Sequence, residues 1–428
     1  MSVSVTFSSA HRILLASEFF MARRPVVDRK QNLVAHELLF CNIAGEECLP
    51  AHDGGDEQPA SASVIADVCE HGMSRVIGDL VGILYIGAEA LMSDIFRFLP
   101  PQKVVLEIED MPVLETALRE RLAALAQAGF RFALVDNGAN RVDSPLLPFV
   151  EGVRLDIAGK DAAQLSRFCA AYRPLQKKLL AERVDTMDQF HACFELGFDF
   201  FQGYYFTQPT LLAGKKLSPS QLAITDLMAL IASDADNSVI EEHIKRDVTL
   251  GLNLLRLANT PAFSAHRIDS LRQALMVLGR NQLQRWLQVM LYADGGSQGS
   301  ATMPLLMQAT TRGRMMELLA QKLRPGNRSY GDTGFTVGIM SLMDTLFGMS
   351  MEDLLGQIPV VEEVADALLR REGFFGKLLS LVECAEWHTR SATPLTQAMR
   401  EWRLSHNDLY LLQLAAFEWS DQVTRSVH

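Results

Sequence analysis

The chain has 428 residues and a formal net charge of −11. A length of this order favours two or three domains, and the acidic balance excludes non-specific nucleic-acid binding, which needs a basic surface. No stretch reaches the ~18 uncharged apolar residues that a membrane helix needs, and the first residues lack the basic start of a signal peptide. We therefore expect a cytoplasmic protein that does not contact membranes.

The first half of the chain alternates between strand-like and helix-like segments. Residues 44–60 are acidic and rich in glycine, so they are expected to form a loop. Beyond them, strands are predicted in residues 103–110, 130–137, 150–157, 176–184 and 199–206, and helices in residues 114–129, 161–174 and 186–197. Repeated strand–helix units favour a parallel sheet covered by helices.

Polar side chains stand near the carboxyl ends of the predicted strands. They are Glu107, Asp136, Asp156, Glu182 and Gln202. Functional residues at this edge are typical of a β/α barrel, because the strand ends meet at one face. The alternative interpretation is that these residues simply begin solvated loops.

The second half of the chain is predicted to be helical. Residues 207–220 are rich in Pro, Gly, Lys and Ser and indicate a connection between domains. Helical periodicity follows in several segments, and residues 270–291 are expected to form two helices that meet at Gly279. The histidines of this half show no paired spacing, which argues against a metal site there. A further hypothesis is a hydrolase in residues 214–405, which metal bound in this half would favour.

Six segments of the first half, in order, resemble the EAL domain, a barrel of cyclic-di-GMP phosphodiesterases. They are residues 22–40, with the tripeptide Glu37-Leu38-Leu39, and residues 105–110, 133–138, 153–156, 179–185 and 197–209. The second half resembles the all-helical HDOD domain in residues 246–287 and 335–379. The pair is similar to the bacterial EAL–HDOD signalling proteins.

This resemblance implies an α/β plus all-α protein, in which a TIM-like β/α barrel precedes a helical domain. The expected organisation is an N-terminal extension in 1–16, a barrel in 17–208 that contains the loop 44–60, a connection in 209–216, an HDOD domain in 217–405 and a C-terminal tail in 406–428.

The resemblance also implies roles for single residues. EAL enzymes are similar to two-metal phosphodiesterases, in which two ions such as Mg²⁺ or Mn²⁺ activate water and stabilise the charge on the phosphate. The metal-binding positions correspond to Glu37, Glu107, Asp136 and Glu182. The positions associated with catalysis correspond to Arg154, Asp156 and Asp185, and those associated with nucleotide binding to Arg24, Arg154 and Gln202.

Three of the positions depart from the family pattern. Gly87 stands where the family has an asparagine that binds metal, Val135 stands where it has a metal-binding aspartate, and Arg154 stands where it has a lysine. An arginine keeps its proton at any useful pH, so Arg154 cannot act as a base. We therefore expect an incomplete metal site, no catalytic residue and no required cofactor.

The sequence thus predicts a signalling adaptor with a degenerate EAL domain, whose HDOD domain binds a protein partner. Retained binding of cyclic-di-GMP and pairing into a homodimer are left open. The alternative is a weak, metal-dependent cyclic-di-GMP phosphodiesterase, which the retained acids favour.

Overall fold

The computed structural model describes residues 19–42, 73–92, 99–111, 113–136, 142–205, 219–260, 263, 266–293, 303–356, 358, 360–386 and 393–426. The extension 1–16, the loop 44–60 and the connection 209–216 lie outside these residues, so their predictions stay untested.

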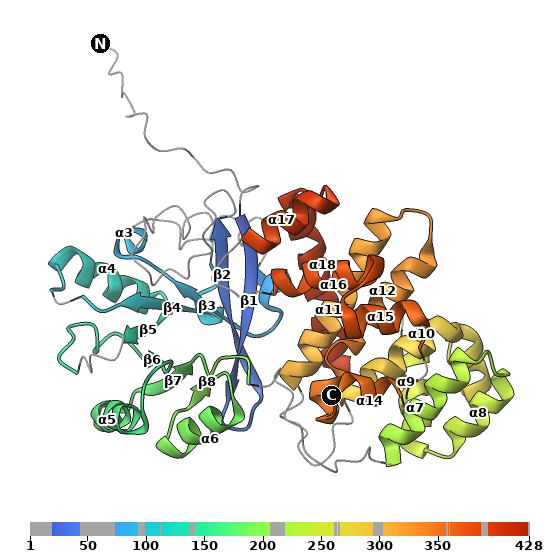
Figure 1. The fold of residues 1–428 in the computed structure, drawn as a ribbon. Helices are drawn as coiled ribbons and strands as arrows, with labels where there is room; N and C mark the ends of the chain where they lie inside the picture. The colour runs from blue at the N-terminus through green and yellow to red at the C-terminus, as the bar shows by residue number, and fades with distance from the viewer. Residues whose placement is uncertain are drawn as a thin grey trace.

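The first half forms a closed barrel in which eight strands are hydrogen-bonded in the order of the sequence (Figure 1). The strands are β1 (Phe19–Asp28), β2 (Leu33–Asn42), β3 (Val81–Tyr85), β4 (Val104–Glu109), β5 (Arg131–Asp136), β6 (Gly152–Asp156), β7 (Lys178–Glu182) and β8 (Phe200–Phe201). This closed barrel, followed by a helical half, confirms the predicted fold class.

One strand departs from the all-parallel pattern of a TIM barrel. β1 runs antiparallel to both β2 and β8, whereas the other neighbouring strands are parallel. The cause is local, because β1 and β2 are joined by a short turn in which the amide of Gln31 donates to the carbonyl of Asp28. A connection this short can join only antiparallel strands.

Short helices cover the outside of the barrel. They are α2 (Met73–Ile77), α3 (Ala88–Leu91), α4 (Thr116–Gln127), α5 (Ala162–Tyr172) and α6 (Met187–Leu196), together with the 3₁₀ turns η3 (Pro101–Lys103) and η4 (Arg173–Leu175). Asp161 and Thr186 begin α5 and α6 with capping boxes, in which the cap side chain and the side chain three residues later satisfy each other's backbone amides.

Alternation along the strands decides which side chains face the barrel interior. Ala35, Val105 and Leu180 belong to the apolar layer inside the barrel. Residues two positions further along point to the same side and lie closer to the carboxyl ends of the strands. These residues are Glu37, Glu107 and Glu182, so three carboxylates converge at the mouth of the barrel.

The second half is helical throughout its described residues. Its helices are α7 (Pro219–Ala232), α8 (Asn237–Lys245), α9 (Val248–Ala258), α10 (Leu271–Ala293), α11 (Met303–Leu323), α12 (Arg328–Met340), α13 (Met343–Phe347), α14 (Met351–Leu355), α15 (Glu362–Arg370), α16 (Gly373–Ala385), α17 (Thr393–Trp402) and α18 (His406–Ser426). Gly279 interrupts α10 with φ 70°, which confirms the predicted break between two helices.

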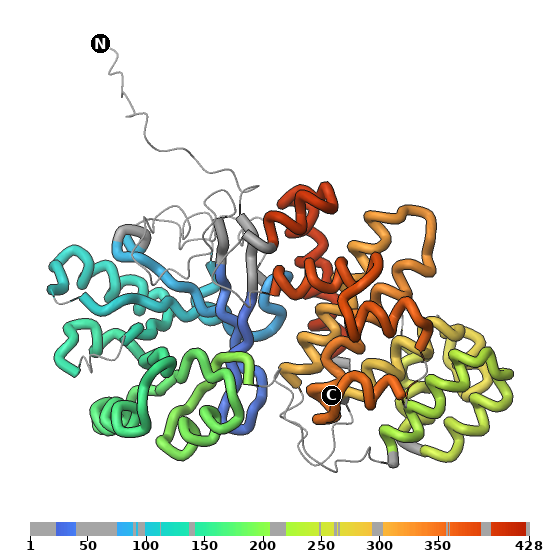
Figure 2. The backbone as a smooth tube through the Cα atoms, viewed as in Figure 1, coloured from blue at the N-terminus to red at the C-terminus, as the bar shows by residue number. Residues whose placement is uncertain are grey.

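The last helix, α18, occupies residues that the sequence set apart as a tail. It packs along α11 and also contacts α2 and β1 of the barrel. Tyr410 and Leu414 of this helix belong to the apolar core of the barrel. α18 therefore packs against both the barrel and the helical half, whose backbones are drawn in Figure 2. Within the described residues, no helix is long and apolar enough to cross a membrane.

Candidate functional site

The guanidinium of Arg154 lies at the centre of the barrel mouth and is bound on several sides. Its Nη1 donates to Oε1 of Glu37 over 2.7 Å and to Oε2 of Glu107 over 2.5 Å. Its Nε donates to Oε2 of Glu182 over 2.8 Å, and its Nη2 donates to Oε1 of Gln202 over 2.7 Å. The side chain is 1% exposed. The cation thus holds four of the predicted site residues together.

A second cation, Arg24, approaches the same carboxylates from β1. Its Nη2 lies 2.8 Å from Oε2 of Glu37, and its Nη1 lies 3.3 Å from Oε1 of Glu182. Arg24 stands opposite Glu37 in the β1–β2 ladder, which explains the short reach. Its side chain is 14% exposed, so it closes the cluster on the side that is nearer to solvent.

The charges of this cluster do not balance when every group is ionised. Three carboxylates, from Glu37, Glu107 and Glu182, face two guanidinium groups. Burial raises the pKa of Glu107 to about 7, against the attraction of Arg154 and with the help of the two neighbouring carboxylates. One shared proton would make the cluster neutral, which is the cheapest state for buried charges.

Burial alone would lower the pKa of Arg154. The carboxylates of Glu107, Glu182 and Glu37 outweigh this effect and hold the pKa well above its ordinary value. Arg154 therefore stays a cation in the folded protein, and it supplies the positive charge that the surrounding acids need.

The structure places Asp136 away from this cluster. Asp136 ends β5 and is 1% exposed, and the hydroxyl of Tyr172 donates to its Oδ2 over 2.6 Å. Tyr172 belongs to α5, which covers the outside of the barrel. The strand alternates, so the preceding residue, Val135, faces the interior, and it stands beside Arg154 in the β5–β6 ladder.

The other predicted positions also have their own local partners. Asp156 forms an ion pair with Arg183, whose Nε lies 2.6 Å from Oδ1. Asp185 accepts from the backbone amide of Tyr204 over 3.2 Å. Gly87 follows β3, and its carbonyl accepts from the amide of Leu91 over 3.2 Å. None of these contacts links the three positions to Arg154.

Comparison with known families assigns both halves of the chain. The model of the EAL domain matches residues 88–209, and the model of the HDOD domain matches residues 218–354. The chain contains an EAL domain followed by an HDOD domain. Glu37 lies outside the matched range of the EAL model, so its assignment rests on the order of the segments and on its place in the barrel.

Two curated relatives match this chain over most of their length. An uncharacterised Bacillus subtilis protein, YuxH, is 28% identical over 413 residues, which cover 94% of this chain and 97% of the relative. The cyclic di-GMP phosphodiesterase CdgJ of Vibrio cholerae is 27% identical over 419 residues, which cover 95% of this chain and 94% of the relative.

Solved structures match about half of the chain more distantly. Klebsiella pneumoniae BlrP1, in a complex with calcium and cyclic-di-GMP, is 19% identical and gives a TM-score of 0.36 over 46% of this chain and 57% of that chain. The phosphodiesterase PaMucR, in a complex with cyclic-di-GMP, is also 19% identical and gives a TM-score of 0.37 over 48% of this chain and 99% of that chain.

The carboxylates of this EAL domain do not fit a metal pair in the described arrangement. Both oxygens of Glu37 and of Glu182, and Oε2 of Glu107, are bound to the guanidinium groups of Arg154 or Arg24. Within the described residues, no group of three or more His, Cys, Asp or Glu side chains is arranged to hold a metal ion. A cation could enter only if Arg154 moved out.

Sequence reasoning did not foresee that Arg154 itself would fill the site. It also missed Tyr172 as the partner of Asp136. A usable signal was present, because an arginine at an inward position of one strand of a closed barrel can face glutamates at inward positions of other strands across the interior. The length of the side chain then decides that the guanidinium reaches the centre.

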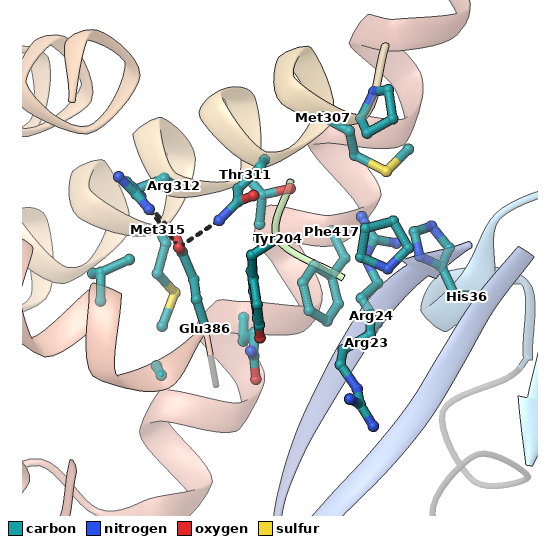
Figure 3. A pocket seen from close by; sticks show the side chains of 16 residues that line it. Arg23, Arg24, His36, Tyr204, Met307, Thr311, Arg312, Met315, Glu386 and Phe417 are labelled. Atoms are coloured by element: carbon teal, nitrogen blue, oxygen red, sulfur yellow. Dashed lines mark hydrogen bonds and ion pairs between the residues drawn. The ribbon is translucent and has the colours of Figure 1, made fainter. Parts of the chain in front are cut away.

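A second, smaller site lies between the EAL and HDOD domains (Figure 3). This pocket of about 80 Å³ is lined by Arg24, His36 and Tyr204 on the barrel side and by Arg312 and Glu386 on the helical side. His36 is 1% exposed, and neither ring nitrogen has a hydrogen-bond partner within the described structure. Burial, helped by Arg23, holds the pKa of His36 well below its ordinary value.

Proposed function

We propose that the chain is a signalling adaptor of the cyclic-di-GMP pathway whose EAL domain does not hydrolyse the nucleotide. One observation carries this proposal: the guanidinium of Arg154 is bonded to all three mouth carboxylates, from Glu37, Glu107 and Glu182. The space and the oxygen ligands that a metal pair would use are engaged by a permanent cation.

The energetics support an inactive site. Two-metal hydrolysis needs both ions at the mouth, one to activate water and one to stabilise the leaving oxygen. Binding an ion there would require Arg154 to leave carboxylates with which it forms a buried, multiply bonded network, and breaking such a network commonly costs ~3–5 kcal/mol. Arg154 cannot replace the lost chemistry, because it does not release its proton.

The three side chains implied in nucleotide binding are not equally accessible to a nucleotide. Arg154 and Gln202 are 1% and 2% exposed, and both are bonded within the cluster. Arg24 keeps 14% of its side chain exposed. We propose that any contact with the phosphates of cyclic-di-GMP falls to Arg24, and that the affinity is weaker than in an EAL enzyme.

The HDOD domain is proposed to contact a protein partner. Large apolar side chains lie on its surface, among them Leu252 of α9 and Met276 and Val277 of α10, which are 54%, 72% and 43% exposed. α9 and α10 contact each other. Exposed apolar side chains on neighbouring helices favour a surface that another protein covers.

The proposal is tested by turnover. Purified full-length chain is incubated with cyclic-di-GMP and Mg²⁺ or Mn²⁺, and the linear product is followed by chromatography. We expect no product above a control without protein. Product formation that Glu37→Ala abolishes would reject the adaptor proposal, because the matched variant removes one mouth carboxylate.

The second candidate function is a weak metal-dependent phosphodiesterase. Two observations favour it. The Vibrio cholerae relative, which matches almost the whole chain, is named a cyclic di-GMP phosphodiesterase. In addition, the carboxylates of Glu37, Glu107 and Glu182 are present at the mouth. In this case Arg154 would have to swing out when metal and nucleotide bind, and the same turnover experiment decides between the two functions.

A further inference from the structure

The interior of the barrel contains a cavity of about 260 Å³ below the Arg154 cluster. This barrel cavity is separate from the pocket between the domains. All eight strands contribute to its apolar lining, which includes Val26, Ala35, Ile83, Ala133, Leu180 and Phe200. Glu107 and Arg154 form its roof, and Arg131, Glu151 and Lys178 stand at its lower rim, where β5, β6 and β7 begin.

The cavity follows from the residues that the sequence places inside the barrel. Eight-stranded barrels of this kind are normally filled by layers of inward side chains, many of them large and branched. Here Ala35, Ala133 and Gly152 occupy inward positions and leave space. Val105 and Phe200 are consequently only half-buried, although they point into the barrel.

The lining determines what the cavity can hold. Its wall is apolar, and the two charged groups of the roof are already paired with each other over 2.5 Å. A charged ligand would lose its hydration and find little to replace it. A cavity of ~150 Å³ with apolar walls is known to stay dry and to bind benzene, so a space of about 260 Å³ has room for one or two fused rings.

We propose that the barrel cavity is a binding site for an uncharged, apolar small molecule of one or two rings, which enters between the strand starts at the lower rim. The bound molecule would contact the underside of the Glu107–Arg154 pair. This inference does not depend on whether the EAL domain is catalytic, because the molecule enters at the strand starts, the end of the barrel opposite the mouth.

The probe for the test is indole, an uncharged molecule with two fused rings. Thermal unfolding of the full-length chain is measured with increasing indole for three proteins: the wild type, Ala133→Leu and Ala126→Leu. Ala133 lines the cavity, whereas Ala126 is an exposed residue of α4 and receives the same added side chain.

We expect indole to raise the unfolding midpoint of the wild type and of Ala126→Leu in a saturable manner, and to leave that of Ala133→Leu unchanged. Ala133→Leu should by itself raise the midpoint, because the new side chain fills empty space. Equal responses of all three proteins, or no response of the wild type, would overturn the proposal.

If Ala133→Leu does not fold, a second measurement that needs only the wild type tests the proposal. Isoleucine methyl groups are labelled, and their NMR spectra are recorded with and without indole. Ile83 lines the cavity, whereas Ile108 is buried in the core outside the barrel interior. A saturable shift of the Ile83 signal with a constant Ile108 signal supports the site, and the absence of a selective shift at Ile83 rejects it.

Discussion

Arg154 and Glu107 face each other across the barrel mouth from β6 and β4, with Nη1 and Oε2 2.5 Å apart and each side chain 1% exposed. The two strands are separated by β5, so the contact crosses the barrel interior instead of following a ladder. A buried ion pair of this kind is costly to break from one side, because the remaining charge loses its partner and has no water around it.

The first prediction concerns the cation itself. Arg154→Met leaves three carboxylates without their central partner, so we expect the free energy of unfolding to fall by about 3–5 kcal/mol. Arg154→Lys keeps the charge but loses the planar set of donors, so its free energy of unfolding should lie between those of the wild type and Arg154→Met. Urea unfolding of the purified proteins measures the difference. Arg119→Met, at an exposed position of α4, should be close to wild type, and an equally small loss for Arg154→Met would contradict the central role of the cation.

The second prediction concerns pH and Glu107. The folded protein raises the pKa of Glu107 from 4.5 to about 7, so between these values the folded state keeps a proton that the unfolded state has released. The contribution of Glu107 to stability is therefore fully present below the unfolded pKa and decreases as the pH rises toward 7, by at most about 1.4 kcal/mol per pH unit for one proton. Urea unfolding of the wild type and of Glu107→Gln over this range measures the slope. Glu107→Gln, which cannot titrate, should reduce the slope, and parallel curves would refute the assignment.

The third prediction concerns metal. Because Arg154 supplies the positive charge at the mouth, adding Mn²⁺ or removing metal with EDTA should leave the thermal unfolding midpoint of the wild type unchanged. Ions that bind only the folded state would raise it. The variant Arg154→Lys with Val135→Asp and Gly87→Asn restores the residue types that the family resemblance implies, and Mn²⁺ should raise its midpoint. A rise in the wild type that Glu37→Ala removes would show that metal enters despite Arg154.

The fourth prediction concerns the contact between the domains. Arg23 of β1 and Asp421 of α18 form an ion pair of 3.1 Å with 4% and 9% side-chain exposure, and the guanidinium lies 3.9 Å from the ring centre of Phe417. A double-mutant cycle with Arg23→Met and Asp421→Asn should give a coupling energy of about 1–3 kcal/mol.

A matched pair provides the control for this cycle. Arg75 of α2 and Glu418 of α18 join the same two domains, but their side chains are 47% and 33% exposed. Exposed pairs of this kind contribute about 0–1 kcal/mol, so Arg75→Met with Glu418→Gln should show weak coupling. Equal coupling energies in the two cycles would mean that burial does not strengthen the Arg23–Asp421 contact.

Much of the fold could be read from the sequence because it depends on local patterns. The segment 130–137 was predicted as a strand, and β5 occupies Arg131–Asp136; residues 114–129 were predicted as a helix, and α4 occupies Thr116–Gln127. Alternation and helical spacing report which face of an element is buried, and this information survives without knowledge of the neighbours.

The sequence predicted an element less accurately where its extent depends on contacts with residues far away in the chain. The predicted strand 199–206 contracts to the two residues of β8, which are fixed by their pairing with β7 and β1. Similarly, the residues assigned to a tail form α18, whose apolar side chains fit surfaces of α11 and of the barrel. Neither partner surface can be recognised from the segment alone.

By itself, the sequence determined the alternation that builds the barrel, the glutamates at its strand ends and the replacement of a lysine by Arg154. Only the tertiary structure decided what these residues do together. Arg154 and Glu37 are 117 positions apart, and the adjacent residues Val135 and Asp136 occupy opposite faces of β5. The length of a side chain and the face from which it projects matter only once the strands are placed next to one another. Closure of the barrel therefore puts the guanidinium of Arg154 among the three carboxylates and places Asp136 beside the hydroxyl of Tyr172.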